Sequence, residues 1–172
     1  GDREKVMVST AATRGPLLAT ASEIDGNVRA FRIKEGQLLW SNAVWPSNTV
    51  CLTFAGEALA VGTDRGKVEL LQAQTGKAIR SLDTRHKRVT ALAASAEGEL
   101  LLVGCILGQQ GKARAGGEVQ LWDLTTGAAT PSATFVVDDL FDEVSALAIS
   151  PDGAYLAAGR AKGDLQVWDR SG

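Results

Sequence analysis

The chain has 172 residues, of which 45% are hydrophobic and 22% are charged, a composition typical of a single globular domain. Eighteen Lys and Arg residues stand against twenty Asp and Glu residues, so the net charge is −2. This balance excludes a generally basic nucleic-acid binder, although it leaves room for a local basic patch. The apolar runs are too short to span a bilayer, and we expect neither a transmembrane helix nor a signal peptide.

Cysteine and histidine are scarce, which limits the chemistry that the chain can perform. Cys51 and Cys105 are the only cysteines and lie in apolar, strand-like surroundings, so we expect two buried free thiols. A structural zinc site needs about four Cys or His ligands, and His86 is the only histidine. No motif for a metalloprotease, a serine hydrolase or a phosphate-binding loop is present. An enzyme that uses a pair of Asp or Glu side chains would have no such motif, but nothing in the sequence points to one. We therefore predict that the chain is not an enzyme and has no metal and no cofactor.

Four consecutive segments share one layout of short apolar strands separated by glycine-containing turns. The glycine that opens the third strand falls at positions 26, 66, 117 and 163. The interval is about 40–45 residues once an insertion at 106–116 is set aside, which is a typical repeat length for stacked β-sheet units. Apolar and polar residues alternate in the third strands, as a sheet requires, and no segment has a helical pattern.

The repeats predict fifteen strands. We expect four in each of the first three repeats and three in the last, where the outer strand is missing. The expected ranges are 5–10, 17–22, 26–33, 37–42, 49–55, 58–63, 66–73, 77–83, 89–95, 100–105, 117–123, 132–137, 144–150, 154–160 and 163–169.

The third strands of the last two repeats end in Trp122-Asp123 and Trp168-Asp169. With this ending and this spacing, the chain resembles the WD-repeat β-propeller family. The first two repeats have Phe31-Arg32 and Leu71-Gln72 at the same place. They are also similar to blades of quinoprotein dehydrogenases and outer-membrane assembly propellers, through Gly36–Trp40 and Thr75–Lys77.

The resemblance implies an all-β fold, a β-propeller of four-stranded antiparallel blades. Residues 1–172 then form one propeller segment with about four blades, near 5–42, 49–83, 89–137 and 144–169. Because the last blade lacks its outer strand, we expect an incomplete arc of a larger ring. Two alternatives stay open: two copies could close a ring of about eight blades, or the four blades could close on themselves.

The resemblance also assigns structural roles. The family links a His before the first strand, a Ser or Thr in the second, an Asp in the turn and the Trp by hydrogen bonds. No repeat here has the complete set, so we expect the blades to rely more on apolar packing. The residues expected to be structural are His86, Trp122, Asp123, Trp168 and Asp169.

Three loops with unusual composition are expected on one face of the propeller, together with a Trp-Pro pair between the first two blades. They are a basic run at 84–88, the insertion at 106–116 and an acidic run at 138–143 with two apolar residues. Aromatic and Arg residues dominate many protein interfaces, and loops on a rigid scaffold commonly carry function. The candidate partner-binding residues are Trp45, Arg85, Lys87, Arg88, Lys112, Arg114, Asp139, Phe141 and Asp142.

We therefore predict a non-catalytic scaffold for protein–protein interactions within a larger intracellular complex, cytoplasmic or nuclear. Its partners would be other subunits or further blades that complete the ring, and self-association is an option. Nucleic acid and membrane insertion are not expected. One alternative is a fragment of a quinoprotein-type or outer-membrane-assembly-type propeller. The other is an RNA-associated propeller, whose RNA binding should weaken with salt if the basic run is used.

Overall fold

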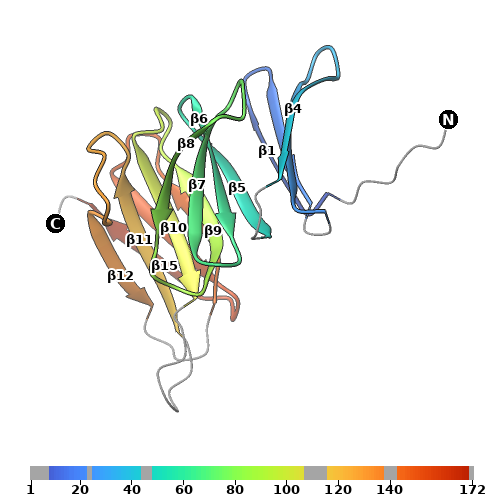
Figure 1. Cartoon of the computed structure of the whole chain (residues 1–172). Helices are drawn as coiled ribbons and strands as arrows, with labels where there is room; N and C mark the ends of the chain where they lie inside the picture. The colour runs from blue at the N-terminus through green and yellow to red at the C-terminus, as the bar shows by residue number, and fades with distance from the viewer. Residues whose placement is uncertain (1–7, 23–24, 44–47, 107–115, 138–142, 171–172) are drawn as a thin grey trace.

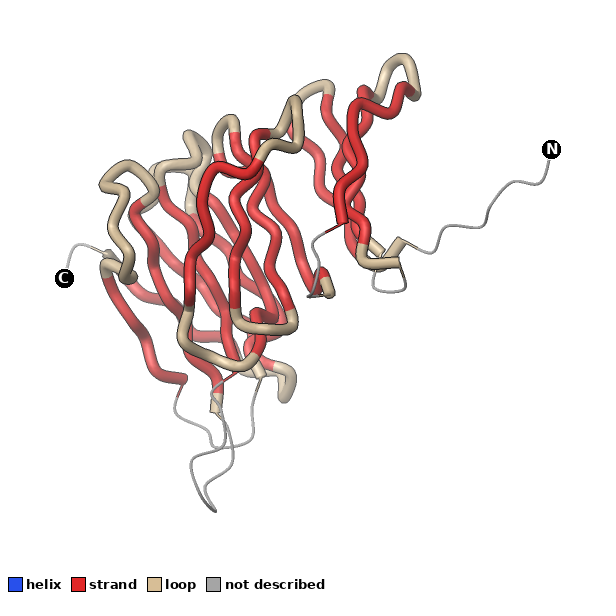
Figure 2. The backbone as a smooth tube through the Cα atoms, viewed as in Figure 1, coloured by secondary structure: helices blue, strands red, loops and turns tan. Residues whose placement is uncertain are grey.

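The computed structural model describes residues 8–22, 25–43, 48–106, 116–137 and 143–170. Every regular element in this part is a β-strand (Figures 1 and 2). The strands form antiparallel sheets in which each strand pairs with the next along the chain. The first sheet contains β1 (Thr10–Arg14), β2 (Leu17–Ala21), β3 (Asn27–Arg32) and β4 (Gln37–Ala43). The second contains β5 (Thr49–Ala55), β6 (Ala58–Thr63), β7 (Lys67–Gln72) and β8 (Ala78–Asp83).

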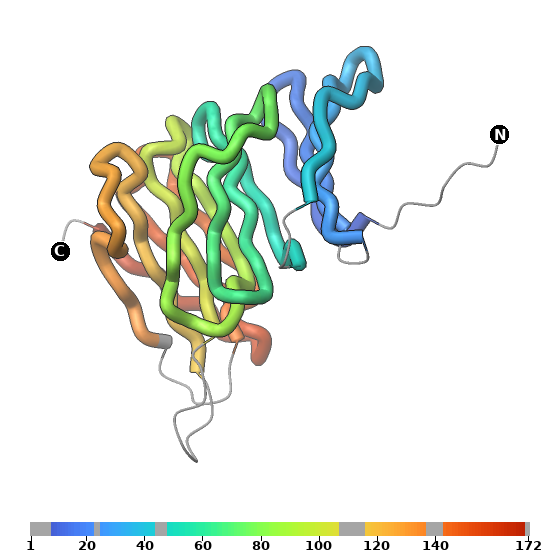
Figure 3. The backbone as a smooth tube through the Cα atoms, in the orientation of Figure 1, coloured from blue at the N-terminus to red at the C-terminus, as the bar shows by residue number. Residues whose placement is uncertain are grey.

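The third and fourth sheets repeat this arrangement. The third contains β9 (Arg88–Ala94), β10 (Leu100–Ile106), β11 (Gly117–Asp123) and β12 (Ala133–Val137). The fourth has three described strands, β13 (Val144–Ile149), β14 (Tyr155–Arg160) and β15 (Leu165–Asp169). The sheets follow one another in chain order across the molecule (Figure 3). These are the blades of a partial β-propeller, as the resemblance to the WD-repeat family implied.

The first strands of the four sheets are neighbours: β1 packs beside β5, β5 beside β9, and β9 beside β13. The described parts of β1 and β13 have no comparable contact with each other. The four sheets therefore form an open arc and not a closed four-bladed ring.

Most expected strands agree with the structure to within one or two residues. The first one does not, because β1 spans Thr10–Arg14 and not 5–10. It pairs with β2 from Thr10 opposite Ala21 to Arg14 opposite Leu17. The sequence TAATR has no large apolar residue, whereas the preceding Val6-Met7-Val8 is a short apolar run. The apolar pattern therefore misplaced this strand, and residues 5–7 lie outside the described part.

The hydrophobic core is divided among the three boundaries between neighbouring sheets. We call the face of a sheet that points toward the next sheet its trailing face, and the face that points toward the preceding sheet its leading face. At each boundary the trailing face of one sheet packs against the leading face of the next. At the second boundary Val68 and Leu70 of the second sheet meet Trp122 of the third. Period-two alternation sends successive side chains to opposite faces, so an inner sheet needs apolar residues on both. The complete set of buried residues at this boundary is Ala60, Val68, Leu70, Leu82, Val89, Leu101, Val103, Cys105 and Trp122.

Candidate partner-binding face

The basic loop, residues 84–88, joins the outer strand of the second sheet to the inner strand of the third. The side chains of Arg85, Lys87 and Arg88 are exposed, and these are three of the predicted partner-binding residues. Arg85 has a φ of 61°, a left-handed conformation that L-residues seldom adopt. Its backbone N–H donates to Oδ1 of Asp83 at 2.9 Å, which helps to hold this turn.

Thr84 fastens the loop to the turn between β6 and β7. Its hydroxyl donates to the carbonyl of Gly66 at 2.6 Å, and its backbone N–H donates to the same carbonyl at 3.1 Å. Gly66 lies so close beneath the loop that an added Cβ would be 1.8 Å from the carbonyl oxygen of His86. Only glycine fits here, since Gly66 also has a φ of 70°.

A chain of polar side chains connects the basic loop to the core of the third sheet. Nε2 of His86 lies 2.6 Å from Oε1 of Glu118. The amide of Gln120 donates to that same carboxylate oxygen at 2.8 Å and to the carbonyl of Thr84 at 3.0 Å. The indole N–H of Trp122 donates to Oε1 of Gln120 at 3.1 Å. The loop is thus anchored to a buried Trp, and its cationic side chains extend from a fixed backbone.

Sequence reasoning missed Glu118 and Gln120 as anchors of this loop. In the sequence, the third repeat has His86 and Trp122 without the complete set of residues of the family's network. In the structure Glu118 and Gln120 on β11 complete a different connection. The available signal was the pair of polar residues two and four positions before Trp122, which alternation places on the same face of the strand as Trp122. Gln120 is only 3% exposed, because the neighbouring sheet covers that face.

The remaining structural residues occupy ends of third strands. Trp122 is buried, and the ring of Trp168 packs at 5.0 Å from that of Phe135, tilted by 35°. Asp123 accepts hydrogen bonds from the hydroxyl and backbone N–H of Thr125 at 2.6 and 2.9 Å. These bonds hold the pKa of the Asp123 carboxyl below its usual value. Asp169 ends β15 and is exposed.

The other predicted partner-binding residues lie outside the described residues, so the structure brings only part of the face together. Their assignment remains a prediction. They are Trp45, Lys112, Arg114, Asp139, Phe141 and Asp142.

Reactive groups elsewhere are few. Cys51 and Cys105 are free thiols, and burial raises the pKa of each to about 12. Within the described ranges, no three His, Cys, Asp or Glu residues group in a way that could hold a metal ion. The described part of the chain also contains no helix long and apolar enough to cross a membrane.

Comparison with known proteins identifies the family. The profile described as "Anaphase-promoting complex subunit 4 WD40 domain" matches residues 12–97, which include both repeats that lack the Trp-Asp ending. The profile "WD domain, G-beta repeat" matches residues 133–169. The WD repeat-containing protein SL1-17 of Schistosoma mansoni is 27% identical over 154 residues, 88% of this chain and 46% of that protein. The chain thus spans about half the length of this relative.

A solved structure gives the same fold. The computationally designed Ika4 protein matches with a TM-score of 0.73 at 22% identity, over 98% of this chain and 94% of that one. At this identity the match concerns the fold alone. The profile matches, the relative and the arc of antiparallel sheets agree, and the chain belongs to the WD-repeat β-propeller family.

Proposed function

We propose that this chain is a scaffold that holds other proteins within a larger intracellular assembly and performs no chemistry of its own. WD-repeat domains generally mediate protein–protein interactions and are generally non-catalytic. A rigid set of sheets that presents loops and open faces is suited to positioning partners. The observation that carries this proposal is that each end of the arc has a face that no other described strand covers.

The trailing face of the fourth sheet is apolar and exposed. Leu165 and Val167 on β15 are 69% and 59% exposed, and Tyr155 on β14 is 54% exposed. The third sheet provides an internal reference, because Val119 and Leu121 occupy the positions of Leu165 and Val167. Those two side chains are 0% and 4% exposed, since the fourth sheet covers them. The end of the arc therefore presents a surface that the fold buries at its internal boundaries.

No other described strand covers the leading face of the first sheet, where Leu18 and Phe31 are half-buried. Leu18 and Phe31 line a shallow groove of about 390 Å³ there. Their counterparts in the second sheet are Leu59 and Leu71, which are buried against the first sheet. The arc thus ends in one trailing face and one leading face, the two kinds of surface that meet at every internal boundary.

We propose that a further WD-type sheet covers each end face. The argument is continuity, since the interface would repeat one that the chain already forms three times. Uncovered sheets and strand edges invite association with other chains, and repeat arrays need capping to remain soluble. The relative of about twice this length has room for additional repeats.

Light scattering on the purified 172-residue chain tests this proposal. We expect a dimer or larger species, and a monomer after Leu165→Asp with Val167→Asp, because two buried carboxylates would oppose the contact. The matched control is Ile79→Asp, which changes an exposed apolar residue away from either end face and should leave the mass unchanged. A dimer indicates that a second copy covers the faces, and larger species indicate that further blades are required. A folded, soluble wild-type monomer would overturn the proposal.

We further propose that Arg85, Lys87 and Arg88 contact an acidic surface of a protein partner. The competing RNA-associated function is tested with a single-stranded oligouridine probe. Phosphate contacts would make binding fall steeply with salt and disappear when the three residues are changed to Ala. We expect no binding of this probe even at low salt, and salt-dependent binding that requires the three cations would favour the RNA function.

A further inference from the structure

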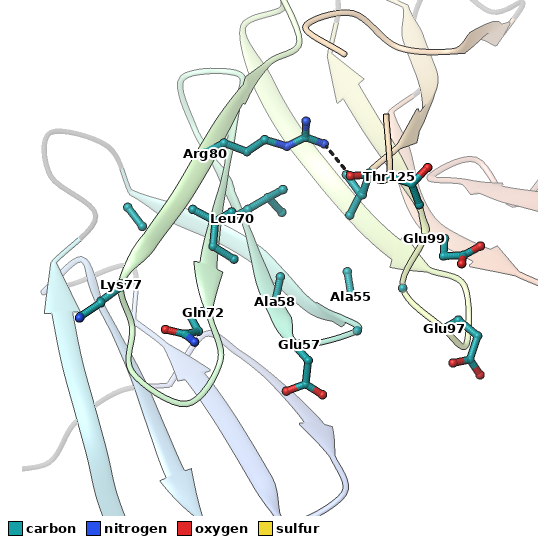
Figure 4. Close-up of a pocket in the computed structure, with 15 residues that line it drawn as sticks. Ala55, Glu57, Ala58, Leu70, Gln72, Lys77, Arg80, Glu97, Glu99 and Thr125 are labelled. Atoms are coloured by element: carbon teal, nitrogen blue, oxygen red, sulfur yellow. Dashed lines mark hydrogen bonds between the residues drawn. The ribbon is translucent and has the colours of Figure 1, made fainter. Parts of the chain in front are cut away.

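A groove of about 610 Å³ lies between the second and third sheets, at the end of the strands opposite the basic loop (Figure 4). Its apolar lining includes Leu70 of β7, Ile79 of β8 and Leu124 just after β11. Ile79 is 56% exposed. The groove lies within the range of about 300–1,000 Å³ that ligand sites usually occupy, and the scaffold proposal above does not use it.

At the first boundary, a Trp side chain fills the space that is equivalent to this groove. Trp40 on β4 pairs with Ala30, next to a register shift between β3 and β4. Its side chain is 8% exposed, and its indole N–H donates to the carbonyl of Ala73 in the second sheet at 2.8 Å. Gly76 lies directly against the indole, since an added Cβ would be 2.6 Å from the ring. An indole therefore fills the first boundary at this level.

Arg80 takes the same place at the second boundary. It pairs with Leu70 next to the equivalent register shift between β7 and β8. Its guanidinium donates to the carbonyl of Leu124 at 3.4 Å, and Leu124 follows its third strand as Ala73 does. The glycine equivalent to Gly76 is Gly127, where an added Cβ would be 3.9 Å from the Arg80 side chain. A thinner, charged side chain has replaced the indole, and the groove occupies the space that remains.

The charged residues at the opening of the groove indicate which kind of ligand it could bind. Glu57 lies on the turn between β5 and β6, while Glu97 and Glu99 lie on the turn between β9 and β10. Figure 4 shows these carboxylates on both sides of the groove, with Arg80 reaching across from β8. All three glutamates are exposed, and in the described residues none of them forms an ion pair. The exposed Lys77 also lines the groove, so three carboxylates stand against one Lys and together complement a cationic segment. The Arg80 guanidinium can lie against an aromatic ring.

We propose that this groove binds an extended peptide of a partner protein, with an aromatic side chain beside Arg80 in the space that the Trp40 indole fills at the first boundary, and a Lys or Arg beside the three glutamates. The apolar lining supplies the contact area for the ring. The carboxylates select the flanking cations. At the second boundary the groove would thus bind an aromatic side chain of a partner, whereas at the first boundary the chain's own Trp40 fills the equivalent space.

The test uses the full 172-residue chain and the capped peptide Lys-Trp-Lys, with Lys-Ala-Lys and Glu-Trp-Glu as reference peptides. Binding is followed by NMR through the methyl resonance of Ile79. We expect Lys-Trp-Lys to shift this resonance and the two reference peptides to shift it at least tenfold less at equal concentration. Equal responses to Lys-Trp-Lys and Lys-Ala-Lys would overturn the proposal.

Arg80→Trp tests whether the groove is the space that the Trp40 indole fills at the first boundary. The new indole should fill the groove, donate to the carbonyl of Leu124 and abolish peptide binding without lowering the thermal midpoint. A second variant, Glu57→Gln with Glu97→Gln and Glu99→Gln, alters only exposed side chains and should weaken Lys-Trp-Lys binding by roughly tenfold. Unchanged binding in this triple variant contradicts the proposal even if Arg80→Trp does not fold.

A final comparison separates this groove from the proposed end-face contacts. The variant Leu165→Asp with Val167→Asp should retain Lys-Trp-Lys binding, because the groove lies at a different boundary. Loss of peptide binding in that variant would place the peptide on the end face and would overturn the groove as its site.

Discussion

Glycine occupies the same position in the second strand of three sheets, where the strand passes the inner strand of the next sheet. A Cβ added to Gly62 would be 2.6 Å from Cγ1 of Val89, and one added to Gly104 would be 2.9 Å from Cγ1 of Val144. At Gly159 the nearest atom is Cβ of Ala146 in the same sheet, at an ordinary 3.5 Å. The first two glycines are therefore required by close packing with the next sheet, to which Sγ of Cys51 in the same sheet adds at 2.7 Å from the Gly62 position. Gly159 stands where no following sheet is described.

Gly62→Ala is expected to destabilise the chain by about 1–3 kcal/mol, because the added methyl group overpacks the boundary. Gly159→Ala is the matched control and should leave the free energy of unfolding nearly unchanged in the monomer. Urea denaturation of both variants measures the difference. Equal losses of stability at the two sites would contradict the packing argument. In an assembly with a following sheet, Gly159→Ala should weaken association.

Burial of the two thiols makes stability depend on pH. The pKa values of Cys51 and Cys105 rise from 9.0 to about 12, so the folded state keeps both protons where the unfolded chain releases them. Above pH 9 the unfolded state binds fewer protons, and stability falls as pH increases toward 12. We expect the variant Cys51→Ala with Cys105→Ala to lose less stability than the wild type between pH 8 and 10, measured by urea denaturation. Identical pH dependence in the two chains would show that the thiols do not contribute.

At the scale of elements, the connection from Trp122 through Gln120 to the basic loop unites a strand and a loop that are distant in sequence. Gln120→Leu removes the acceptor of the indole N–H and the donor to Thr84, and each loss leaves a buried polar group without its partner. We expect destabilisation of about 1–3 kcal/mol together with faster amide exchange in residues 84–87. Hydrogen exchange followed by mass spectrometry measures both effects.

The control for this variant is the equivalent residue on β15. The side-chain oxygen of Gln166 is buried and accepts no hydrogen bond from the described residues. Gln166→Leu should therefore change stability little. A large loss in this variant, or unchanged exchange of residues 84–87 in Gln120→Leu, would contradict the role assigned to Gln120.

The strands differ in how well the sequence predicts them. β11 was predicted with the bounds that the structure has, because Gly117–Asp123 combines clear alternation with the Trp-Asp ending. β1 was misplaced, since its Thr, Ala and Arg side chains have no apolar alternation. Such a strand is defined by its pairing with β2, a tertiary contact that no local pattern contains.

The candidate site was predictable only in part for a similar reason. Charge and exposure of Arg85, Lys87 and Arg88 follow from their sequence. The anchoring by Glu118 and Gln120 depends on which sheet covers their face of β11. The equivalence of Trp40 on β4 and Arg80 on β8 can be recognised only from the strand pairing of the structure, which aligns these two outer strands.

At the scale of the whole molecule, the described strands cover the two inner sheets on both faces and the two terminal sheets on one face. Stability in repeat proteins is approximately a sum of terms within repeats and between neighbours, so the terminal sheets have fewer stabilising contacts. We expect β5–β12 to exchange their amides more slowly than β1–β4 and β13–β15 in the monomeric Leu165→Asp, Val167→Asp chain. Equal protection of all four sheets would show that the ends do not differ from the interior.

The pairing of each strand with its successor has a consequence for synthesis on the ribosome. Since each sheet is built from one continuous stretch of chain, each can form as soon as its own residues have emerged, before the next sheet exists. During translation the second and third sheets would each pass through the condition of the fourth, with an apolar trailing face exposed until the following sheet arrives. The nascent chain is therefore expected to expose such an apolar surface repeatedly, each time for about the time needed to synthesise one repeat. During these intervals a chaperone could bind the exposed surface.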